Sequence, residues 1–370
     1  MLGGMFTKLR PLVTQWTTVV PLLALLVLVL TWHRDLPGWV VGVVSCFLAG
    51  AVLAAVHHAE VVAHRVGEPF GSLVLAVAVT VIEVALIVTL MADGGDKSAT
   101  LARDTVFAAV MITCNGIVGV SILAAAIKHR VAVFNAEGTG AALATIGTLA
   151  TLSLVLPTFT TSSPGPQFNP TQLAFAAAAS LVLYLLFVAT LTFRHRDYFL
   201  PVTSDGKVLD EEDHADPPTK RAMVFSLVLL GVALISVVGL AKGVSPTIES
   251  GVESAGLPSS VVGVVIALLV LLPETIAAVR AARRNRVQTS LNLALGSALA
   301  SIGLTIPAVA IASHWLSGPL VLGLDPAHLV LLTLTLVVGT LTVIPRRATP
   351  LQGAVHLAIL AAYVELAIVP

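Results

Sequence analysis

Apolar residues occur along the chain in long runs that are separated by short polar segments. Most runs reach about 20 residues, the length at which an α-helix crosses the hydrocarbon core of a bilayer. They are rich in Ala, Leu and Val and show no alternating ten-residue strand pattern, so helices must satisfy the backbone polar groups. The pattern predicts an all-α polytopic membrane protein with about eleven transmembrane helices. The expected cores are 13–31, 37–58, 70–92, 103–127, 138–157, 171–193, 222–242, 258–280, 287–311, 326–345 and 350–369.

The basic residues give an independent test of this count, because Lys and Arg accumulate in cytoplasmic loops. With the N-terminus inside, 16 of the 20 basic residues fall on the cytoplasmic side. The outer ones are Arg34, Lys97, Arg103 and Lys242. Composition agrees with a membrane protein, since 57% of residues are hydrophobic and only 11% are charged. We therefore expect a multi-pass protein with a cytoplasmic N-terminus and an outer C-terminus.

An acidic hydrophilic stretch at 194–221 divides the chain, with six expected helices before it and five after it. Two related units with an odd number of helices enter the membrane from opposite sides, which is the inverted-repeat plan of many transporters. The expected layout is an extra N-terminal transmembrane helix at 1–36, a five-helix repeat at 37–193, a cytoplasmic connector at 194–221 and a second five-helix repeat at 222–370.

The sequence itself contains traces of such a repeat. Placing the second helix of each unit in register sets Glu83 opposite Glu274, each within a largely apolar run. With seven more residues in the first unit's loop, three further pairs coincide. They are Thr105 with Thr289, Thr113 with Ser297, and Gly119 with Gly303.

The two matched glutamates are the strongest candidates for ion chemistry. A carboxylate at the centre of a membrane helix costs roughly 2.5 to 3.5 kcal/mol, and such residues usually face the bundle interior or a wet cavity. Burial favours the protonated carboxyl, whereas a nearby cation favours the ionised one. If Glu83 and Glu274 meet at mid-membrane, the pair can hold either protons or a metal cation and exchange one for the other. The alternative interpretation is a pair of protonated glutamates that only pack.

Weaker candidates surround the glutamates. Pro273 precedes Glu274 and should disrupt its helix, freeing carbonyl oxygens that could bind a cation, although an ordinary kink is the alternative. Calcium takes about 6 to 8 oxygen ligands, so two carboxylates need help from other groups. Thr113 and Ser297 offer hydroxyls, and Asn115 and Asn292 offer amides. Polar residues of this kind also join membrane helices without binding ions.

Other polar groups favour simpler interpretations. His57, His58 and His64, with Glu60, look like a metal cluster, but their position near a membrane boundary favours a solvated cytoplasmic rim, with pH sensing as the alternative. The chain carries no H-E-x-x-H, G-x-S-x-G or phosphate-binding loop motif. We therefore expect neither an enzyme nor ATP hydrolysis within this chain, no cofactor and no nucleic-acid partner.

Two segments resemble a known family. They are GEPFGSLVLAVAVTVIEVALI at 67–87 and VVGVVIALLVLLPETIAAVRAARRNRVQTSLNLALGSALASIGLTIP at 261–307. These resemble the two α-repeats of the calcium/cation antiporter superfamily, and the whole chain is similar to its bacterial ChaA-type antiporters. Related exchangers often carry a Gly-Asn pair just before each glutamate. Here the corresponding residues are Val79-Thr80 and Val270-Leu271, which leaves the choice among calcium, sodium and potassium open.

The resemblance implies a secondary antiporter of the bacterial inner membrane that works by alternating access. Glu83 and Glu274 would bind the transported cation, with Ser297 and Asn115 as auxiliary ligands. We expect Ca²⁺ export in exchange for H⁺, with Na⁺ or K⁺/H⁺ exchange at the same site as the alternative. An ion channel or membrane scaffold is the different-class alternative. The expected partners are membrane lipid and the transported ions, and the two glutamates should lie within about 12 Å of one another near the midplane.

Overall fold

The computed structural model describes residues 15–32, 34, 36–66, 70–94, 99–202, 218–258, 260–316 and 318–369. Most of the acidic connector, at 203–217, lies outside the described residues, as do Lys8 and Arg10. The helices are α2 (Trp16–Thr31), α3 (Gly38–Val66), α4 (Phe70–Gly94), α5 (Leu101–Met111), η2 (Ile112–Ile117), α6 (Val118–His129), α7 (Ala136–Ala150), η3 (Thr151–Val155), α8 (Leu156–Phe159), α9 (Pro170–Ala189), η4 (Thr190–Arg194), η5 (Arg196–Phe199), α10 (Lys220–Ser254), α11 (Ser260–Arg283), α12 (Val287–Ala312), α13 (Pro326–Val343) and α14 (Pro350–Ile368). The strands are β1 (Ala132–Val133) and β2 (Arg347–Ala348).

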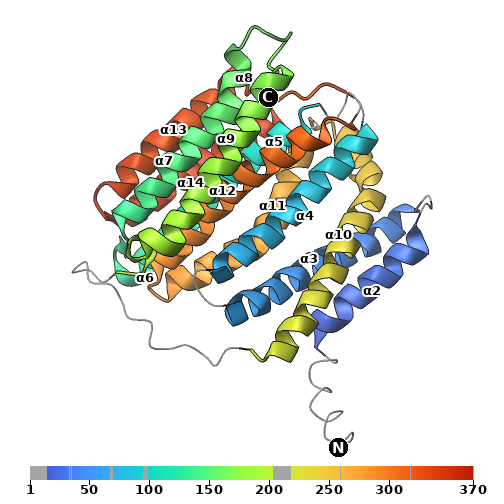
Figure 1. The fold of residues 1–370 in the computed structure, drawn as a ribbon, viewed down its shortest axis with the longest axis horizontal. Helices are drawn as coiled ribbons and strands as arrows, with labels where there is room; N and C mark the ends of the chain where they lie inside the picture. The colour runs from blue at the N-terminus through green and yellow to red at the C-terminus, as the bar shows by residue number, and fades with distance from the viewer. Residues whose placement is uncertain are drawn as a thin grey trace, which may run out of the picture. The chain divides into compact units, whose positions relative to one another are not determined.

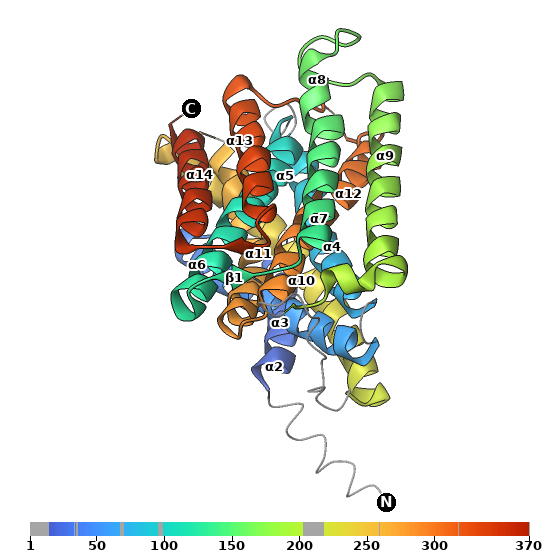
Figure 2. The ribbon, with the colours of Figure 1, turned by 90° about the vertical axis from the view of Figure 1, so that its left-hand side faces the viewer.

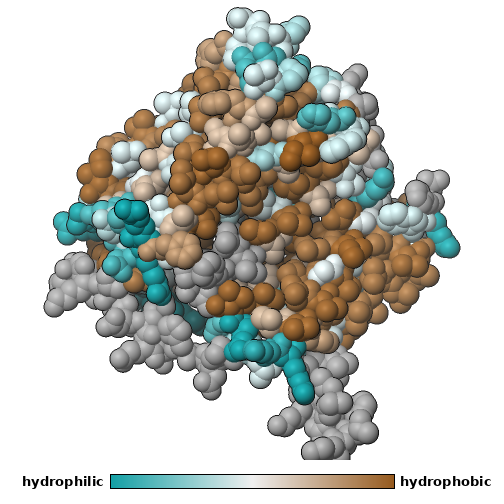
Figure 3. All heavy atoms as spheres, viewed as in Figure 1, coloured by the Kyte–Doolittle hydropathy of each residue, from teal (hydrophilic) through white to brown (hydrophobic). Residues whose placement is uncertain are grey.

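Each expected core overlaps one helix or one run of consecutive helices (Figure 1). Within the described residues, eight spans are long and apolar enough to cross a membrane, and α11 is a ninth if its two bent halves count as one span. Shorter apolar helices occupy Trp16–Thr31 and Val77–Ala92. On the face shown in Figure 3, apolar residues form broad continuous areas, as expected for helices that face lipid. The helical, multi-pass fold class is confirmed, while the count of eleven spans stays a prediction.

The described helices form two compact units. The first comprises residues within Met1–Thr89 and His214–Ser254, and the second those within Leu90–Asp213 and Ala255–Pro370. Each unit therefore draws on both expected repeats. Compact packing and sequence repetition are different properties, so the repeat layout also stays a prediction.

In the first unit, α2, α3 and α10 pack against one another (Figure 1). A buried histidine joins all three helices. His58 on α3 lies 2.9 Å from the carbonyl oxygen of Thr17 on α2 and 3.2 Å from Ser226 Oγ on α10. His58 is only 3% exposed, so the expected solvated rim is wrong at this residue. It was missed because its partners are 41 and 168 residues away in the sequence.

In the second unit, α12 packs against α5, α6, α7, α9 and α11 (Figure 2). The two most buried spans are Leu101–His129, with 89% of its apolar window buried, and Val287–Ala312, with 78%. Pro170–Arg194 has only 22% buried and is a peripheral span of this unit. The central pair is therefore α5–η2–α6 and α12, the two spans that carry the candidate hydroxyl and amide ligands.

Close helix contact and a short β-pair connect α13 and α14 with the rest of the second unit. A Cβ on Gly353 of α14 would lie 2.9 Å from the Gly119 carbonyl oxygen of α6, so glycine is needed for this approach. Strands β1 and β2 pair antiparallel, with Ala132 opposite Ala348 and Val133 opposite Arg347. The β-pair joins the segments that follow α6 and α13, and the apolar pattern did not predict it.

Candidate cation-binding site

Glu274 on α11 and Ser297 on α12 form the best-defined part of the candidate site. Ser297 Oγ donates a 2.7 Å hydrogen bond to Glu274 Oε2. The two residues are only 5% and 7% exposed. A hydrogen bond to a carboxylate is shorter and stronger than one between neutral groups, so it holds the carboxyl in a defined orientation. The structure thus brings together two of the residues that the sequence predicted as ligands.

Helix α11 changes direction immediately before Glu274. The segments Ser260–Leu272 and Glu274–Arg283 are inclined by 51°, and Pro273 separates them. Proline lacks the N–H that would continue the helical hydrogen bonding at this point. Thr275 Oγ1 donates a 2.7 Å hydrogen bond to the Leu271 carbonyl oxygen across the bend. Glu274 is therefore the first residue after the bend.

Glu83 is equally buried, on α4. It is 3% exposed and lies between Val79, Ile82 and Ile87, all of which are buried. The apolar neighbours along α4 explain why a carboxyl group at this position stands out in the sequence. Glu83 belongs to the first compact unit and Glu274 to the second. Their meeting at one site stays a prediction.

Thr113 lies in η2, a π-helical turn in the middle of the α5–η2–α6 span. Its hydroxyl donates to the carbonyl oxygen of Ala109 at 2.7 Å, with Val110 O at 3.1 Å. Such π-turns are frequent at functional sites because they widen the helix and redirect neighbouring side chains. Sequence reasoning named Thr113 as a candidate ligand but did not predict the π-turn.

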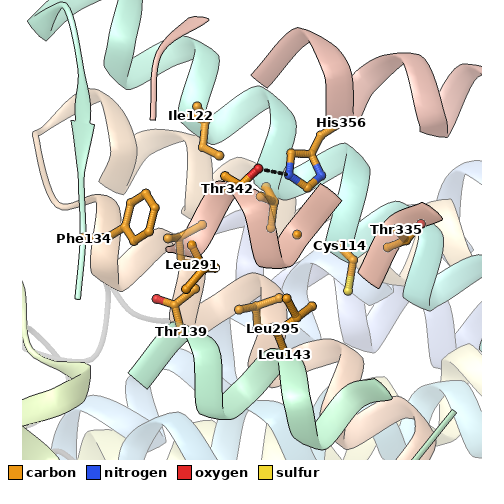
Figure 4. A pocket seen from close by; sticks show the side chains of 13 residues that line it. Cys114, Ile122, Phe134, Thr139, Leu143, Leu291, Leu295, Thr335, Thr342 and His356 are labelled. Carbon is orange, nitrogen blue, oxygen red and sulfur yellow. Dashed lines mark hydrogen bonds between the residues drawn. The ribbon is translucent and has the colours of Figure 1, made fainter. Parts of the chain in front are cut away.

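Asn115, in the same turn, is part of a buried hydrogen-bond chain. Its Nδ2 donates to Thr335 Oγ1 at 2.9 Å, and its Oδ1 lies 3.1 Å from His356 Nδ1. On the far side of the ring, His356 Nε2 lies 3.1 Å from Thr342 Oγ1 (Figure 4). Thr335 donates to the Leu331 carbonyl oxygen at 2.8 Å.

These contacts fix the direction of the hydrogen bonds around Thr335 and Asn115. Because Thr335 donates its proton to Leu331, its oxygen accepts from Asn115, and the Asn115 oxygen is left to accept from His356. His356 therefore carries a proton on Nδ1, and its Nε2 lies against Thr342 Oγ1. Sequence analysis missed His356, Thr335 and Thr342. A histidine inside the apolar run at 350–369 was the available signal.

A small cavity of about 20 Å³ adjoins this chain. One water molecule needs roughly 10–15 Å³ and two or more polar partners. His356, Thr335 and Thr342 line it together with Cys114, Leu291 and Leu295, but the exposed wall is almost entirely apolar (Figure 4). The cavity has the volume for one water molecule but offers it almost no polar surface.

Asn292, the remaining predicted ligand, is engaged in a different set of contacts. Its Nδ2 donates to the Phe199 carbonyl oxygen at 2.6 Å, and its Oδ1 accepts from Gln288 Nε2 at 2.8 Å. It lies five residues before Ser297, and at 100° per residue the two point about 140° apart around α12. The structure does not bring Asn292 together with Ser297. Within the described residues, no three His, Cys, Asp or Glu side chains gather closely enough to hold a metal ion.

The fold and these buried polar groups define a multi-pass membrane protein with ionisable side chains inside its helical spans. A sequence profile of the sodium/calcium exchanger protein family matches residues 36–193 and 225–369. The chain belongs to this family, within the calcium/cation antiporter superfamily, so the predicted family is confirmed.

Three relatives illustrate the likeness. The chain is 48% identical over 365 residues to a protein of Sinorhizobium fredii (strain NBRC 101917 / NGR234) named provisionally as ionic transporter y4hA, and the match covers 97% of each chain. It is 33% identical over 352 residues to the sodium-potassium/proton antiporter ChaA of Escherichia coli (strain K12), covering 94% of this chain and 95% of that one. The crystal structure of the H⁺/Ca²⁺ exchanger CAX matches with a TM-score of 0.70 at 15% identity, covering 95% of this chain and 91% of that chain. These relatives are transporters, in agreement with the expectation of a non-enzymatic protein.

Proposed function

We propose that this antiporter exports Ca²⁺ in exchange for H⁺, with Glu83 and Glu274 as the shared ion-binding carboxyls. The observation that carries the proposal is the hydrogen bond from Ser297 to the buried Glu274. Burying an ionised carboxyl in a membrane span costs free energy unless the charge is compensated by a bound cation or the group keeps its proton. Two such groups in one site can alternate between holding protons and holding a divalent cation.

The ligand requirement of calcium supports a site built from both repeats. Two carboxylates supply at most four oxygens, and Ca²⁺ takes about 6 to 8. Ser297 is positioned to add a hydroxyl oxygen, and the bend in α11 gives a further source of carbonyl oxygens. Asn115 and Thr113 are weaker candidates, because both already make hydrogen bonds within the protein.

Sodium or potassium exchange for protons at the same carboxyls is the second candidate. The observation that favours it is the 33% identity to an antiporter whose name gives sodium and potassium as its ions. A monovalent cation needs less negative charge than calcium does, so one ionised glutamate could suffice. The two candidates share the site and differ in how many protons return for each cation.

The location and mode of transport follow from the charge pattern and the family. We infer an inner-membrane protein with its N-terminus in the cytoplasm, because this orientation places 16 of the 20 basic residues inside. Two inverted five-helix repeats would rearrange around the bound ion, giving alternating access. The family profile matches two stretches, 36–193 and 225–369, that begin and end near the expected repeat boundaries.

The test is cation-driven proton movement in proteoliposomes. Wild type, Glu83→Gln and Glu274→Gln are reconstituted, and internal pH is followed after addition of Ca²⁺, Na⁺ or K⁺. We expect each glutamine variant to lose coupled exchange by at least about 100-fold, the effect of removing a charge worth more than about 3 kcal/mol in the transport cycle.

The matched control is Glu365→Gln, because Glu365 also lies in an apolar helix but is exposed. It should exchange at nearly the wild-type rate. Normal coupling in both Glu83→Gln and Glu274→Gln would show that the coupling site is elsewhere. Cation flux without proton movement in wild type would favour a channel.

A further inference from the structure

Two threonine hydroxyls in the second unit lack the hydrogen bonds that other membrane-helix threonines make. Thr145 and Thr333, for example, each donate to the carbonyl oxygen four residues earlier at 2.8 Å. Thr105 on α5 and Thr305 on α12 are 0% exposed, yet their hydroxyls have no partner among the described residues. A buried polar group without a partner is rare and often marks the place of a water molecule or an ion.

Thr305 continues a row of hydroxyls that begins at the candidate site. Ser297, Ser301 and Thr305 are spaced four residues apart, so each is turned by only about 40° from the one before it. All three are buried. From Ser297, which contacts Glu274, the row rises about 12 Å along α12 toward the end expected to face outside.

Thr105 lies on α5, where that helix contacts α11. A Cβ on Gly263 of α11 would lie 3.1 Å from Thr105 N and 3.2 Å from Asp104 Cβ, so these helices are in close contact at this level. Gly263 precedes Glu274 by 11 residues, about three helical turns, and lies toward the outer end of α11. Helices α5, α11 and α12 all pack against one another, and Thr105 and Thr305 lie on two of the three helices that form this junction.

A charged pair lies at the outer end of this junction. Arg103 Nη2 is 2.7 Å from Asp104 Oδ1, and Arg103 Nη1 donates to the Gly323 carbonyl oxygen at 3.2 Å. The two side chains are only 14% and 8% exposed. The Arg103 contact connects the start of α5 to the segment before α13.

We propose that Thr105 and Thr305 line a water-holding route through which the exchanged ions pass between Glu274 and the outer surface, with Arg103 and Asp104 closing its mouth. This inference rests on the proposed function, since it assigns an outward path to the same site. Hydroxyl oxygens suit both the cation and the proton, because they replace water around a cation and bind the water molecules that conduct protons.

Ser180 provides a matched control. Its hydroxyl is also fully buried and has no partner among the described residues, but it lies on α9. One turn further on, Tyr184 packs against Gly303, since a Cβ there would lie 2.6 Å from the Tyr184 Cβ. Gly303 lies on the opposite side of α12 from Thr305, about 200° around the helix axis. Ser180 therefore belongs to a helix contact and not to the proposed route.

The first experiment measures accessibility without relying on transport. Thr105→Cys, Thr305→Cys and Ser180→Cys are each made in a Cys46→Ala, Cys114→Ala parent that lacks thiols. Right-side-out and inverted vesicles are treated with a charged, membrane-impermeant methanethiosulfonate, and modification is read by protein mass. We expect the two threonine positions to react from the outside at least about tenfold faster than Ser180→Cys, and 10 mM Ca²⁺ to slow the reaction at Thr305→Cys, as expected when a cation occupies a shared path.

The route would be overturned if Thr105→Cys and Thr305→Cys, in monodisperse protein, react from the outside no faster than Ser180→Cys. Reaction only from the inside would overturn it as well. Because the readout is chemical, labelling can fail while the Glu83→Gln and Glu274→Gln results hold, and the proposed function would then survive without this route. If labelling succeeds but the wild-type protein shows no coupled exchange, the route would be supported and the proposed function would not.

Isosteric substitution gives the second experiment. Thr305→Val keeps the shape and removes the hydroxyl, whereas Thr305→Ser keeps the hydroxyl. We expect Thr305→Val to lower the maximal exchange rate about tenfold with little change in the cation KM, and Thr305→Ser and Ser180→Ala to stay within about twofold of wild type. Equal rates for Thr305→Val and Thr305→Ser would contradict a role for the hydroxyl.

Discussion

The α5–η2–α6 span and α12 occupy equivalent places in the two expected repeats, but their matched polar residues make different contacts. Both are central spans of the second unit, with 89% and 78% of their apolar windows buried. Ser297 of α12 donates its hydroxyl to the Glu274 carboxyl, whereas Thr113, its counterpart, donates to the backbone of its own helix. Sequence symmetry therefore matches the residue types and depths without matching the contacts.

The π-turn explains part of this difference. In η2 the backbone takes an extra residue per turn, so side chains on either side of it change phase relative to a regular helix such as α12. Asn115 is thereby directed toward α13 and α14, where Thr335 and His356 hold it. The span α12 thus contributes a hydroxyl directly to Glu274, while the polar side chain of Asn115 in η2 joins helices.

The largest effect within this comparison is expected at Ser297. Ser297→Ala removes a hydrogen bond to a charged group, worth about 1.5–3 kcal/mol, and should raise the cation KM by about tenfold or more. Thr113→Val removes only a bond to the helix backbone and should change KM by less than about threefold. Both are measured by initial rates of exchange against cation concentration in proteoliposomes. The reverse order would show that Thr113 and not Ser297 is the ligand.

A smaller effect is expected on the stability of the protein when the hydrogen-bond chain through Asn115 is broken. Asn115→Ala and His356→Ala each leave a buried partner unsatisfied and should lower the free energy of unfolding by about 1–3 kcal/mol. Since both break the same chain, the double variant should lose less than the sum, with a coupling of about 0.5–3 kcal/mol. The measurement is thermal unfolding of detergent-solubilised protein.

Thr333→Val serves as the control for this cycle, because Thr333 lies on the same helix as Thr335 but is exposed and bonds only to its own backbone. It should be neutral. Additive losses for Asn115→Ala and His356→Ala would mean that the two residues do not act as one chain.

The helical organisation could be predicted from the sequence because it depends on local patterns. The expected core 287–311, for instance, coincides almost entirely with α12, Val287–Ala312. Glu274 and Ser297 could be predicted as candidate ligands because each matches a residue of similar type in the first half of the chain. The hydrogen bonds of His58, Asn115 and Asn292 could not, since their partners lie tens to hundreds of residues away and are selected by tertiary packing. The apolar pattern of the sequence gives no indication of the π-turn at Ile112–Ile117.

The smallest effect is expected on thermal stability, and it concerns the N-terminal caps of α12 and α13, which differ. Arg286 begins α12 without a side-chain cap, whereas Asp325 caps α13 by accepting a 3.0 Å hydrogen bond from the His328 N–H. Partial burial of Asp325 opposes its ionisation, but the His328 N–H and the charges of His328 and Arg103 outweigh this and lower its pKa. The ionised carboxylate is thus favoured in the folded protein over the unfolded one.

Linkage gives the sign of the resulting pH dependence. A carboxyl whose pKa is lowered by folding contributes stability above its unfolded pKa, about 3.9 for Asp, and loses that contribution as pH falls through the lower folded value. Asp325→Asn keeps an N-cap oxygen but no charge, so it should melt slightly below wild type at pH 6, and the gap should close as pH falls below about 4. Thermal unfolding of both proteins across this range measures the gap. A gap that widened toward acid would mean that the folded protein favours the neutral carboxyl, and the attraction of Asp325 to His328 and Arg103 would then be too weak to offset its burial.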